Sequence, residues 1–294
     1  MQLRPLNDLP LLEKAAALAD EAGLELYAVG GCARDWALGR TSEDIDFLVG
    51  GDQAPLVAGL ELAYGGSHRK FTPFLTVRFF SAEGRRLDFA RFRKETYARP
   101  GALPTVSEAA SAAEDLLRRD FACNAMAVRL NGPERYSLLD PYGGLADLNA
   151  GLLRVLHEKS FEDDPTRLYR AARFAGRFGW RLEDNTRDLA LAAVKGGLPG
   201  LLSRERLRNE LVKILSEENP LPALDQLKDL GALSFIHPAF AFGPSVAAQA
   251  GAKARLAAAA ALMGGAGEEF LAELKFSRKE TEELRVLSES LRRA

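Results

Sequence analysis

The first half of the chain alternates short apolar runs with Gly, Pro, Asn and Asp, which is typical of strands and short helices joined by tight turns. Apolar residues at a helical period predict a helix, whereas a short continuous apolar run predicts a buried strand. The elements expected in this half are, in chain order, a helix over 11–22, a strand over 24–29, a short helix over 34–38, a strand over 44–49, strands over 76–80 and 86–92 joined by a turn at 83–84, a helix over 107–117 and a strand over 128–130.

The pattern changes after the turn at 141–144, where strands give way to amphipathic helices that continue to residue 294. We therefore expect an α+β fold in which a small mixed sheet precedes an all-helical region. The change of pattern predicts a domain boundary near Gly151.

Composition limits the class of protein without selecting a partner. With 294 residues and 47% hydrophobic content, the chain is long enough for two or more packed domains. Its 39 basic and 41 acidic residues give a net charge of -2, which neither predicts nor excludes a nucleic-acid partner. The two cysteines lack metal-ligand spacing, the N-terminus lacks the apolar core of a signal peptide, and no apolar run is long enough for a bilayer. We expect a cytoplasmic protein without a membrane segment.

Two carboxylates one residue apart, Asp44 and Asp46, are the first candidate for chemistry. Residues i and i+2 of a strand point to the same face, so both carboxylates can converge on one hard cation. A lone Asp-x-Asp is more often a solvated turn. The residues upstream change that interpretation, because the pair Gly30 and Gly31 lets backbone N–H groups approach an anion and Arg34 adds a charged fork for phosphate oxygens. A metal site beside a phosphate cradle indicates nucleotidyl transfer.

Further polar residues could complete such a site. Asp88, on the strand expected over 86–92, is either a third carboxylate or an anchor for a neighbouring arginine. Arg119 and Asp120 could hold the phosphates and ribose of a nucleotide, together with Asn124, although an ion pair at a helix end would look the same.

A third group of charges opens the helical region, where Asp164 precedes a helix that carries Arg167, Arg170 and Arg173 at intervals of three residues. The simple interpretation is a solvated helix face with acids at its N-terminus. Alternatively, Asp164 and Arg167 offer acceptors and donors to the Watson–Crick edge of a base, while the other two arginines meet phosphates. The helix over 203–211 would brace this group.

In its combined pattern the chain resembles the class II tRNA nucleotidyltransferase and bacterial poly(A) polymerase family. The resemblance runs from about residue 26 to 215 and is carried, in the family's order, by Gly-Gly-Cys-Ala-Arg-Asp, Glu-Asp-Ile-Asp, Arg-Arg-Asp-Phe-Ala-Cys-Asn-Ala, Asp-Asp-Pro-Thr-Arg and Glu-Arg-Leu-Arg-Asn-Glu-Leu. It implies a polymerase-β-like catalytic head over 1–150, a helical neck for base recognition over 151–215 and a helical RNA-binding body over 216–294. The segment 94–104 is similar to the family's flexible segment.

The resemblance also implies roles for single residues, and the activity would be addition of CMP, AMP or both to the 3′ end of tRNA. The implied assignments are magnesium binding by Asp44 and Asp46, triphosphate binding by Gly31 and Arg34, contacts with phosphates and ribose by Arg119 and Asp120, recognition of the incoming base by Asp164 and Arg167, and completion of the pocket by Arg170 and Arg173. ATP and CTP would be the substrates, and tRNA or another RNA 3′ end the partner.

The chain departs from the family pattern in two places. Ala122 stands where the family usually has threonine, which removes one hydroxyl near the ribose motif. The chain also stops soon after a helix over 268–293, so a reduced module for measuring tRNA shape is expected. This leaves CCA addition, CC-only or A-only addition and poly(A) synthesis as alternatives, with a catalytically silent RNA-binding protein as a distant one.

Overall fold

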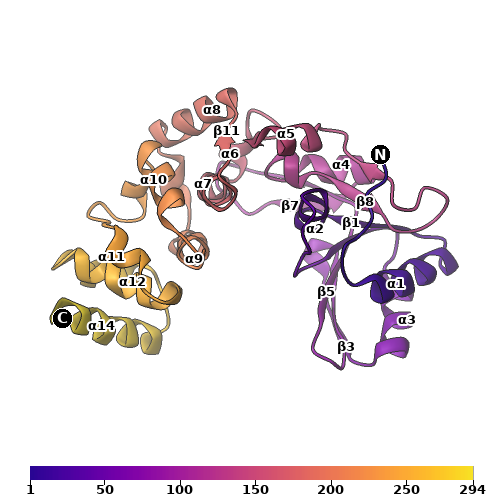
Figure 1. The fold of residues 1–294 in the computed structure, drawn as a ribbon, viewed down its shortest axis with the longest axis horizontal. Helices are drawn as coiled ribbons and strands as arrows, with labels where there is room; N and C mark the ends of the chain where they lie inside the picture. The colour runs from indigo at the N-terminus through magenta and orange to yellow at the C-terminus, as the bar shows by residue number, and fades with distance from the viewer. Residues whose placement is uncertain (294) are drawn as a thin grey trace. The chain divides into compact units, whose positions relative to one another are not determined.

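The computed structural model describes residues 1–293, which fold into two compact units (Figure 1). Unit 1 consists of Met1–Ala98, Leu103–Ala150 and Arg154–Leu156, and unit 2 of Arg99–Ala102, Gly151–Leu153 and the chain from His157 onward. The main change of unit therefore falls between Ala150 and Gly151. Among residues 1–293, none of the helices combines the length and apolar character needed to cross a bilayer.

Unit 1 is built on a seven-stranded mixed sheet with the strand order β3-β4-β5-β2-β1-β8-β9. Its strands are β1 (Glu25–Val29), β2 (Asp46–Gly50), β3 (Ser67–Phe71), β4 (Thr76–Phe80), β5 (Arg86–Arg91), β8 (Ala127–Arg129) and β9 (Leu138–Leu139). Neighbouring strands run antiparallel except β2 and β5, which are parallel. The predicted hairpin of β4 and β5 is confirmed, and Gly84 takes the positive φ of 82° that its turn requires.

Different helices pack against the two faces of this sheet. The helical segments of unit 1 are α1 (Leu9–Glu21), α2 (Gly31–Ala37), α3 (Ala54–Tyr64), α4 (Ala112–Leu117), α5 (Gly144–Ala150), and the 3₁₀ turns η1 (Thr72–Phe74) and η2 (Ala122–Asn124). On one face, Tyr27 and Leu48 belong to a buried apolar cluster that includes Leu116 of α4. On the other face, the side chain of His68 meets Glu61 of α3. This division arises because successive side chains of a strand point to opposite faces of the sheet.

The helix predicted over 107–117 is wrong in its first part. Residues Thr105–Glu108 form β7, which pairs antiparallel with β6 (Arg93–Thr96). The helix α4 begins only at Ala112, after Ser111, whose side chain accepts a hydrogen bond from the Glu114 backbone N–H. Pairing with β6, on the other side of the loop over 97–104, overrides the local helical pattern, and a sequence window does not detect such pairing.

Unit 2 is helical apart from one short strand pair. Its helical segments are α6 (Ser160–Asp163), α7 (Thr166–Phe178), α8 (Asp184–Lys195), η3 (Leu198–Leu201), α9 (Arg204–Leu215), α10 (Leu221–Asp229), η4 (Leu233–Phe235), α11 (Pro244–Ala247), α12 (Gly251–Leu262), α13 (Ala266–Glu273) and α14 (Arg278–Arg293). The parallel pair of β10 (Leu152–Leu153) and β11 (Arg181–Leu182) is the exception to the all-helical prediction. A mixed sheet followed by a helical region confirms the predicted fold class.

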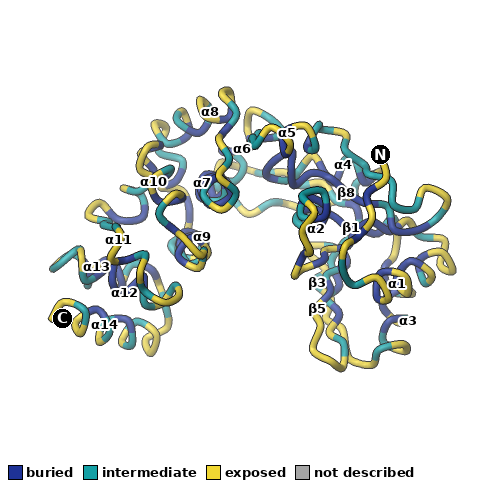
Figure 2. The backbone as a smooth tube through the Cα atoms, viewed as in Figure 1, coloured by how far each residue is buried: buried dark blue, intermediate teal, exposed yellow. Residues whose placement is uncertain are grey.

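The central helix of unit 2 is α7, most of which is buried (Figure 2). It packs against α9 and α10. At its crossing with α10, a Cβ on Gly176 would lie 2.7 Å from the backbone nitrogen of Ala223, so only glycine fits there. The same helix carries Arg167, Arg170 and Arg173, the arginines predicted to lie at the site.

Candidate active site in unit 1 and charged cluster in unit 2

The two carboxylates of the Asp-x-Asp pair lie at one end of the unit 1 sheet. Asp46 is the first residue of β2, and Asp44 precedes the strand by two residues. Both are exposed, whereas Ile45 between them is buried, which is the alternation expected when the carboxylates share a side. Across the sheet, Asp46 is paired with Val29 of β1 on one side and Asp88 of β5 on the other.

The position of Asp88 is compatible with both interpretations that the sequence left open. It accepts hydrogen bonds from Nε and Nη2 of Arg78, at 2.6 and 3.0 Å, so it anchors a neighbouring arginine. It also stands directly beside Asp46 in the parallel β2–β5 pair. Arg86 lies 3.8 Å from the Asp88 carboxylate and 4.0 Å from that of Asp44. Three carboxylates and two arginines therefore meet at this end of the sheet.

The electrostatics of this group favour a bound cation. Desolvation by the surrounding protein is the main cause that raises the pKa of Asp46; the positive charge of Arg119 opposes it, and the negative charges of Asp88 and Asp44 add to it. A hard divalent cation would relieve the repulsion between the carboxylates, which are the oxygen ligands that magnesium prefers. Asp44 and Asp46 thus form a donor set that fits magnesium.

The glycine turn before α2 brings Arg119 close to this site. Gly30 has φ 74°, and a Cβ at this position would lie 2.8 Å from Nη1 of Arg119. Nη2 of Arg119 lies 3.4 Å from the fully buried carboxylate of Asp115. The backbone conformation therefore favours glycine, and a larger residue would displace the guanidinium from its position.

A chain of hydrogen bonds links the other predicted residues of unit 1. Arg34, which is buried, donates from Nη1 to Oδ1 of Asn124 at 2.7 Å, and from Nη2 to Oδ1 of Asp35 at the same distance. Asn124 in turn donates to Oδ1 of Asp120 at 3.0 Å, and that oxygen also accepts the Phe121 backbone N–H. The turn at Gly31, Arg34 and Asp120 are thereby held as one group.

The sequence interpretation missed Asp115. This carboxylate, fully buried in α4, accepts hydrogen bonds from Arg118 and Arg119 and from the Arg93 backbone N–H. The spacing of four residues between Asp115, near the end of the predicted helix, and Arg119, just past that end, was the available signal. Its burial depends on β6, which the sequence pattern did not reveal.

In unit 2, Asp164 lies between α6 and α7, and its carboxylate makes all of its described hydrogen bonds through one oxygen. Oδ1 accepts hydrogen bonds from the backbone N–H and hydroxyl of Thr166, at 2.9 and 2.6 Å, and from Nη2 of Arg206 at 2.7 Å. Arg206 also donates to the carbonyl oxygen of Gly101. The brace expected from the helix over 203–211 is present, and the other carboxylate oxygen of Asp164 has no hydrogen bond within residues 1–293.

The predicted site arginines of α7 differ in their surroundings. Arg167 is buried and donates from Nη1 to the hydroxyl of Ser160 at 2.6 Å. Arg173 is also buried, with its guanidinium carbon 4.6 Å from the ring centre of Phe174 and Nη1 3.4 Å from Glu217. Burial, followed by the charge of Arg170, lowers the pKa of Arg173. A solvated helix face does not describe Arg167 and Arg173.

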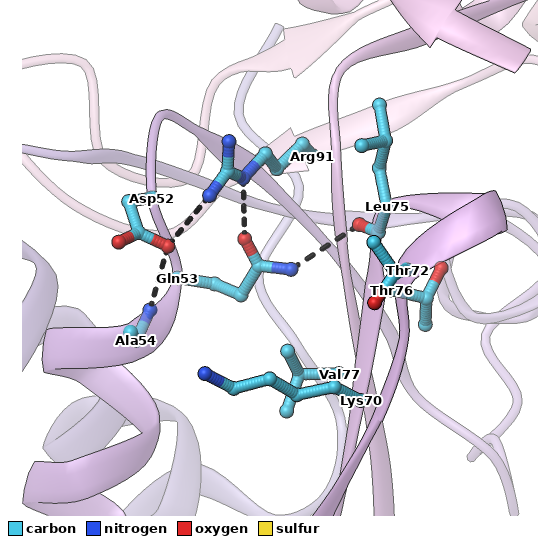
Figure 3. A pocket seen from close by; sticks show the side chains of 9 residues that line it. All are labelled: Asp52, Gln53, Ala54, Lys70, Thr72, Leu75, Thr76, Val77 and Arg91. Atoms are coloured by element: carbon cyan, nitrogen blue, oxygen red, sulfur yellow. Dashed lines mark hydrogen bonds and ion pairs between the residues drawn. The ribbon is translucent and has the colours of Figure 1, made fainter.

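Figure 3 shows a cavity of about 200 Å³ in unit 1. The strand pairing places it at the end of the sheet opposite to Asp46. Arg91, the last residue of β5, donates to Gln53 and to Asp52, and Gln53 donates to the carbonyl oxygen of Leu75. The side chain of Lys70 extends into the cavity. None of the predicted site residues lines it.

A mixed sheet with paired carboxylates at one strand end, beside a glycine turn and buried arginines, defines the class of a nucleotidyltransferase head domain. Two family models match the chain, the "Poly A polymerase head domain" over residues 26–154 and the "Probable RNA and SrmB-binding site of polymerase A" over residues 201–242. The chain belongs to the tRNA nucleotidyltransferase and poly(A) polymerase family, which confirms the resemblance.

Relatives and solved structures support this membership. The A-adding tRNA nucleotidyltransferase of Halalkalibacterium halodurans is 40% identical over 76% of the chain and 53% of that protein. The CC-adding tRNA nucleotidyltransferase of Deinococcus radiodurans is 38% identical over 71% of the chain and 54% of that protein. The structure of the Thermotoga maritima CCA-adding enzyme complexed with tRNA has a TM-score of 0.78 at 30% identity, over 98% of the chain and 71% of that enzyme. The chain thus spans about half the length of the two curated relatives.

Proposed function

We propose that the protein is a template-independent nucleotidyltransferase that adds CMP, AMP or both to the 3′ end of tRNA, using CTP and ATP. The observation that carries the proposal is the group at one end of the unit 1 sheet, where Asp44 and Asp46 adjoin a glycine turn over which the Arg119 guanidinium lies. A nucleic-acid-binding module alone has no need for two adjacent carboxylates at a strand end, nor for the raised pKa of Asp46. Such a role in tRNA processing also fits a cytoplasmic protein.

The proposed reaction is in-line attack of an RNA 3′-hydroxyl on the α-phosphorus of the nucleotide, with pyrophosphate as the leaving group. Asp44 and Asp46 would hold two magnesium ions, which when bound lower the pKa of the 3′-hydroxyl and neutralise the leaving group. Arg34, Arg119 and the Gly30–Gly31 turn would bind the triphosphate, and Asp120 the ribose side of the nucleotide. These groups are preorganised by the hydrogen bonds that connect Arg34, Asn124 and Asp120, so little reordering is needed on binding.

Base selection is proposed to lie with unit 2, where Asp164 and Arg167 would read the Watson–Crick edge. Arg206 and Thr166 hold one oxygen of Asp164, which leaves the other oxygen to accept a hydrogen bond from an amino group of cytosine or adenine. Arg170 and Arg173 would support this pocket. Accordingly we assign catalysis to residues 1–150, base recognition to 151–215 and RNA binding to 216–294.

The test offers the purified protein a tRNA without CCA, a tRNA ending in CC and an unstructured oligonucleotide, each with magnesium and one labelled nucleotide at a time. Extension of only the first tRNA, by CTP, indicates CC addition, and extension of only the second, by ATP, indicates A addition. Extension of both tRNAs indicates full CCA addition, and extension of the oligonucleotide indicates poly(A) synthesis. Asp44→Ala and Asp46→Ala should abolish every product. Asp52→Ala, at the opposite end of β2, is the control and should retain activity. Turnover by both active-site variants would contradict the metal assignment.

A further inference from the structure

A row of paired residues runs from the proposed metal site across the sheet to its open edge. Asp46 is paired with Asp88, Asp88 with Arg78, and Arg78 with Arg69 on the edge strand β3. Residues that are paired across neighbouring strands project to the same face. With strands about 4.8 Å apart, the backbones of Arg78 and Arg69 lie about 10 and about 14 Å from that of Asp46.

The two arginines at the end of this row share an aromatic support. The guanidinium carbons of Arg69 and Arg78 each lie 5.1 Å from the ring centre of Phe71, two residues along β3 from Arg69 and on the same face. Arg78 is also tied to Asp88, but no carboxylate among residues 1–293 lies within ion-pair distance of the exposed Arg69. A guanidinium held over an aromatic ring is restricted in its motion, which favours contact with a phosphate or stacking on a base.

The geometry of the proposed reaction indicates which ligand lies along the row from Asp46 to Arg69. The proposed triphosphate cradle, Gly30, Gly31 and Arg34, follows β1, which adjoins β2 on one side. In-line displacement places the attacking hydroxyl opposite the leaving pyrophosphate. The hydroxyl must then approach from the other side of β2, where β5, β4 and β3 follow in order. The RNA chain that carries this hydroxyl therefore crosses the face that bears Arg78 and Arg69.

We propose that Arg69, supported by Phe71, binds the phosphate backbone of the RNA substrate a few nucleotides before its 3′ end. This role rests on the proposed function and extends it, because it assigns the β3–β5 side of unit 1 to the RNA strand. A competing role for a charged edge strand is to prevent edge-to-edge pairing with another molecule. RNA binding predicts that Arg69 matters for the KM for tRNA and its neighbour Lys70 does not, whereas protection of the edge strand predicts no such difference in KM.

Lys70 provides the matched control, because it is the next residue on the same exposed strand and projects to the other face, into the cavity of Figure 3. With the tRNA and nucleotide that give product in the wild type, Arg69→Ala should raise the KM for tRNA roughly three- to tenfold and leave the KM for the nucleotide unchanged. The slope of log affinity against log salt should become shallower by about 0.7, as expected for one lost contact to a single-strand phosphate. Arg69→Lys should be intermediate, and Lys70→Ala should match the wild type.

The outcomes separate this proposal from the one that it rests on. Equal KM values for tRNA in Arg69→Ala and Lys70→Ala would overturn the role of Arg69, and so would self-association of Arg69→Ala on a sizing column with an unchanged KM. A wild-type protein that extends no RNA would overturn the proposed function and with it the role of Arg69. Thermal unfolding of each variant shows whether a raised KM comes from misfolding. If Arg69→Ala does not fold, the KM of Arg69→Lys for tRNA tests the role of Arg69 instead, and a wild-type value would overturn it.

Discussion

Gly30→Ala is the substitution whose effect follows most directly from the structure. The change adds one methyl group at a residue with φ 74°, where an L side chain is strained, and that strain costs roughly 1–3 kcal/mol of stability. In addition, the new Cβ would lie 2.8 Å from Nη1 of Arg119, a distance that forces the guanidinium to move.

Movement of Arg119 removes a charged contact from the proposed triphosphate site. Hydrogen bonds to charged groups contribute about 1.5–3 kcal/mol, so kcat/KM for the nucleotide should fall roughly 10- to 100-fold. Gly39→Ala is the matched control, because Gly39 has nearly the same φ, 72°, just past the other end of α2, and a Cβ there meets nothing within 4 Å. The Gly39→Ala variant should also lose stability, but its kcat/KM for the nucleotide should remain that of the wild type.

The assay combines urea unfolding with steady-state kinetics at saturating tRNA for the wild type and both variants. Stability should fall in both variants because both place an L side chain at a positive φ, whereas kcat/KM for the nucleotide should fall only in Gly30→Ala. Equal kcat/KM values in the two variants would refute the reasoning, because backbone strain alone would then account for the effect.

Three further predictions concern base choice, pH and metal. Asp164→Ala should relax selectivity among the four nucleotides more than it weakens RNA binding, and Arg206→Ala should act in the same direction; unchanged selectivity in Asp164→Ala would refute the recognition role. Burial and then Arg167 lower the pKa of His157 below 6.5, so folding should lose stability as pH falls through that value, and thermal unfolding of His157→Gln should show a smaller loss. Magnesium at a hundredfold excess over its Kd should stabilise the wild type against unfolding by about 2.7 kcal/mol, and an equal gain in Asp46→Asn would contradict the metal site.

What the sequence determined by itself is local in origin. The exposure of Asp44 and Asp46 on either side of the buried Ile45, the glycine turn at Gly30 and Gly31 and the cluster of charges that opens α7 all follow from residues within a few positions of one another. The two-part fold is local in the same sense, because it follows from the change of apolar period along the chain. These features were predictable from the order of residues.

Contacts between distant segments decided the rest. Asp88 stands beside Asp46 only because β2 and β5 pair in parallel, and Arg206 reaches Asp164 only because α9 packs against α7. The same cause explains the wrong helix prediction, since pairing with β6 determined the structure of Thr105–Glu108. Pairing and packing depend on which segments meet in space, and a local sequence pattern carries no information on that choice.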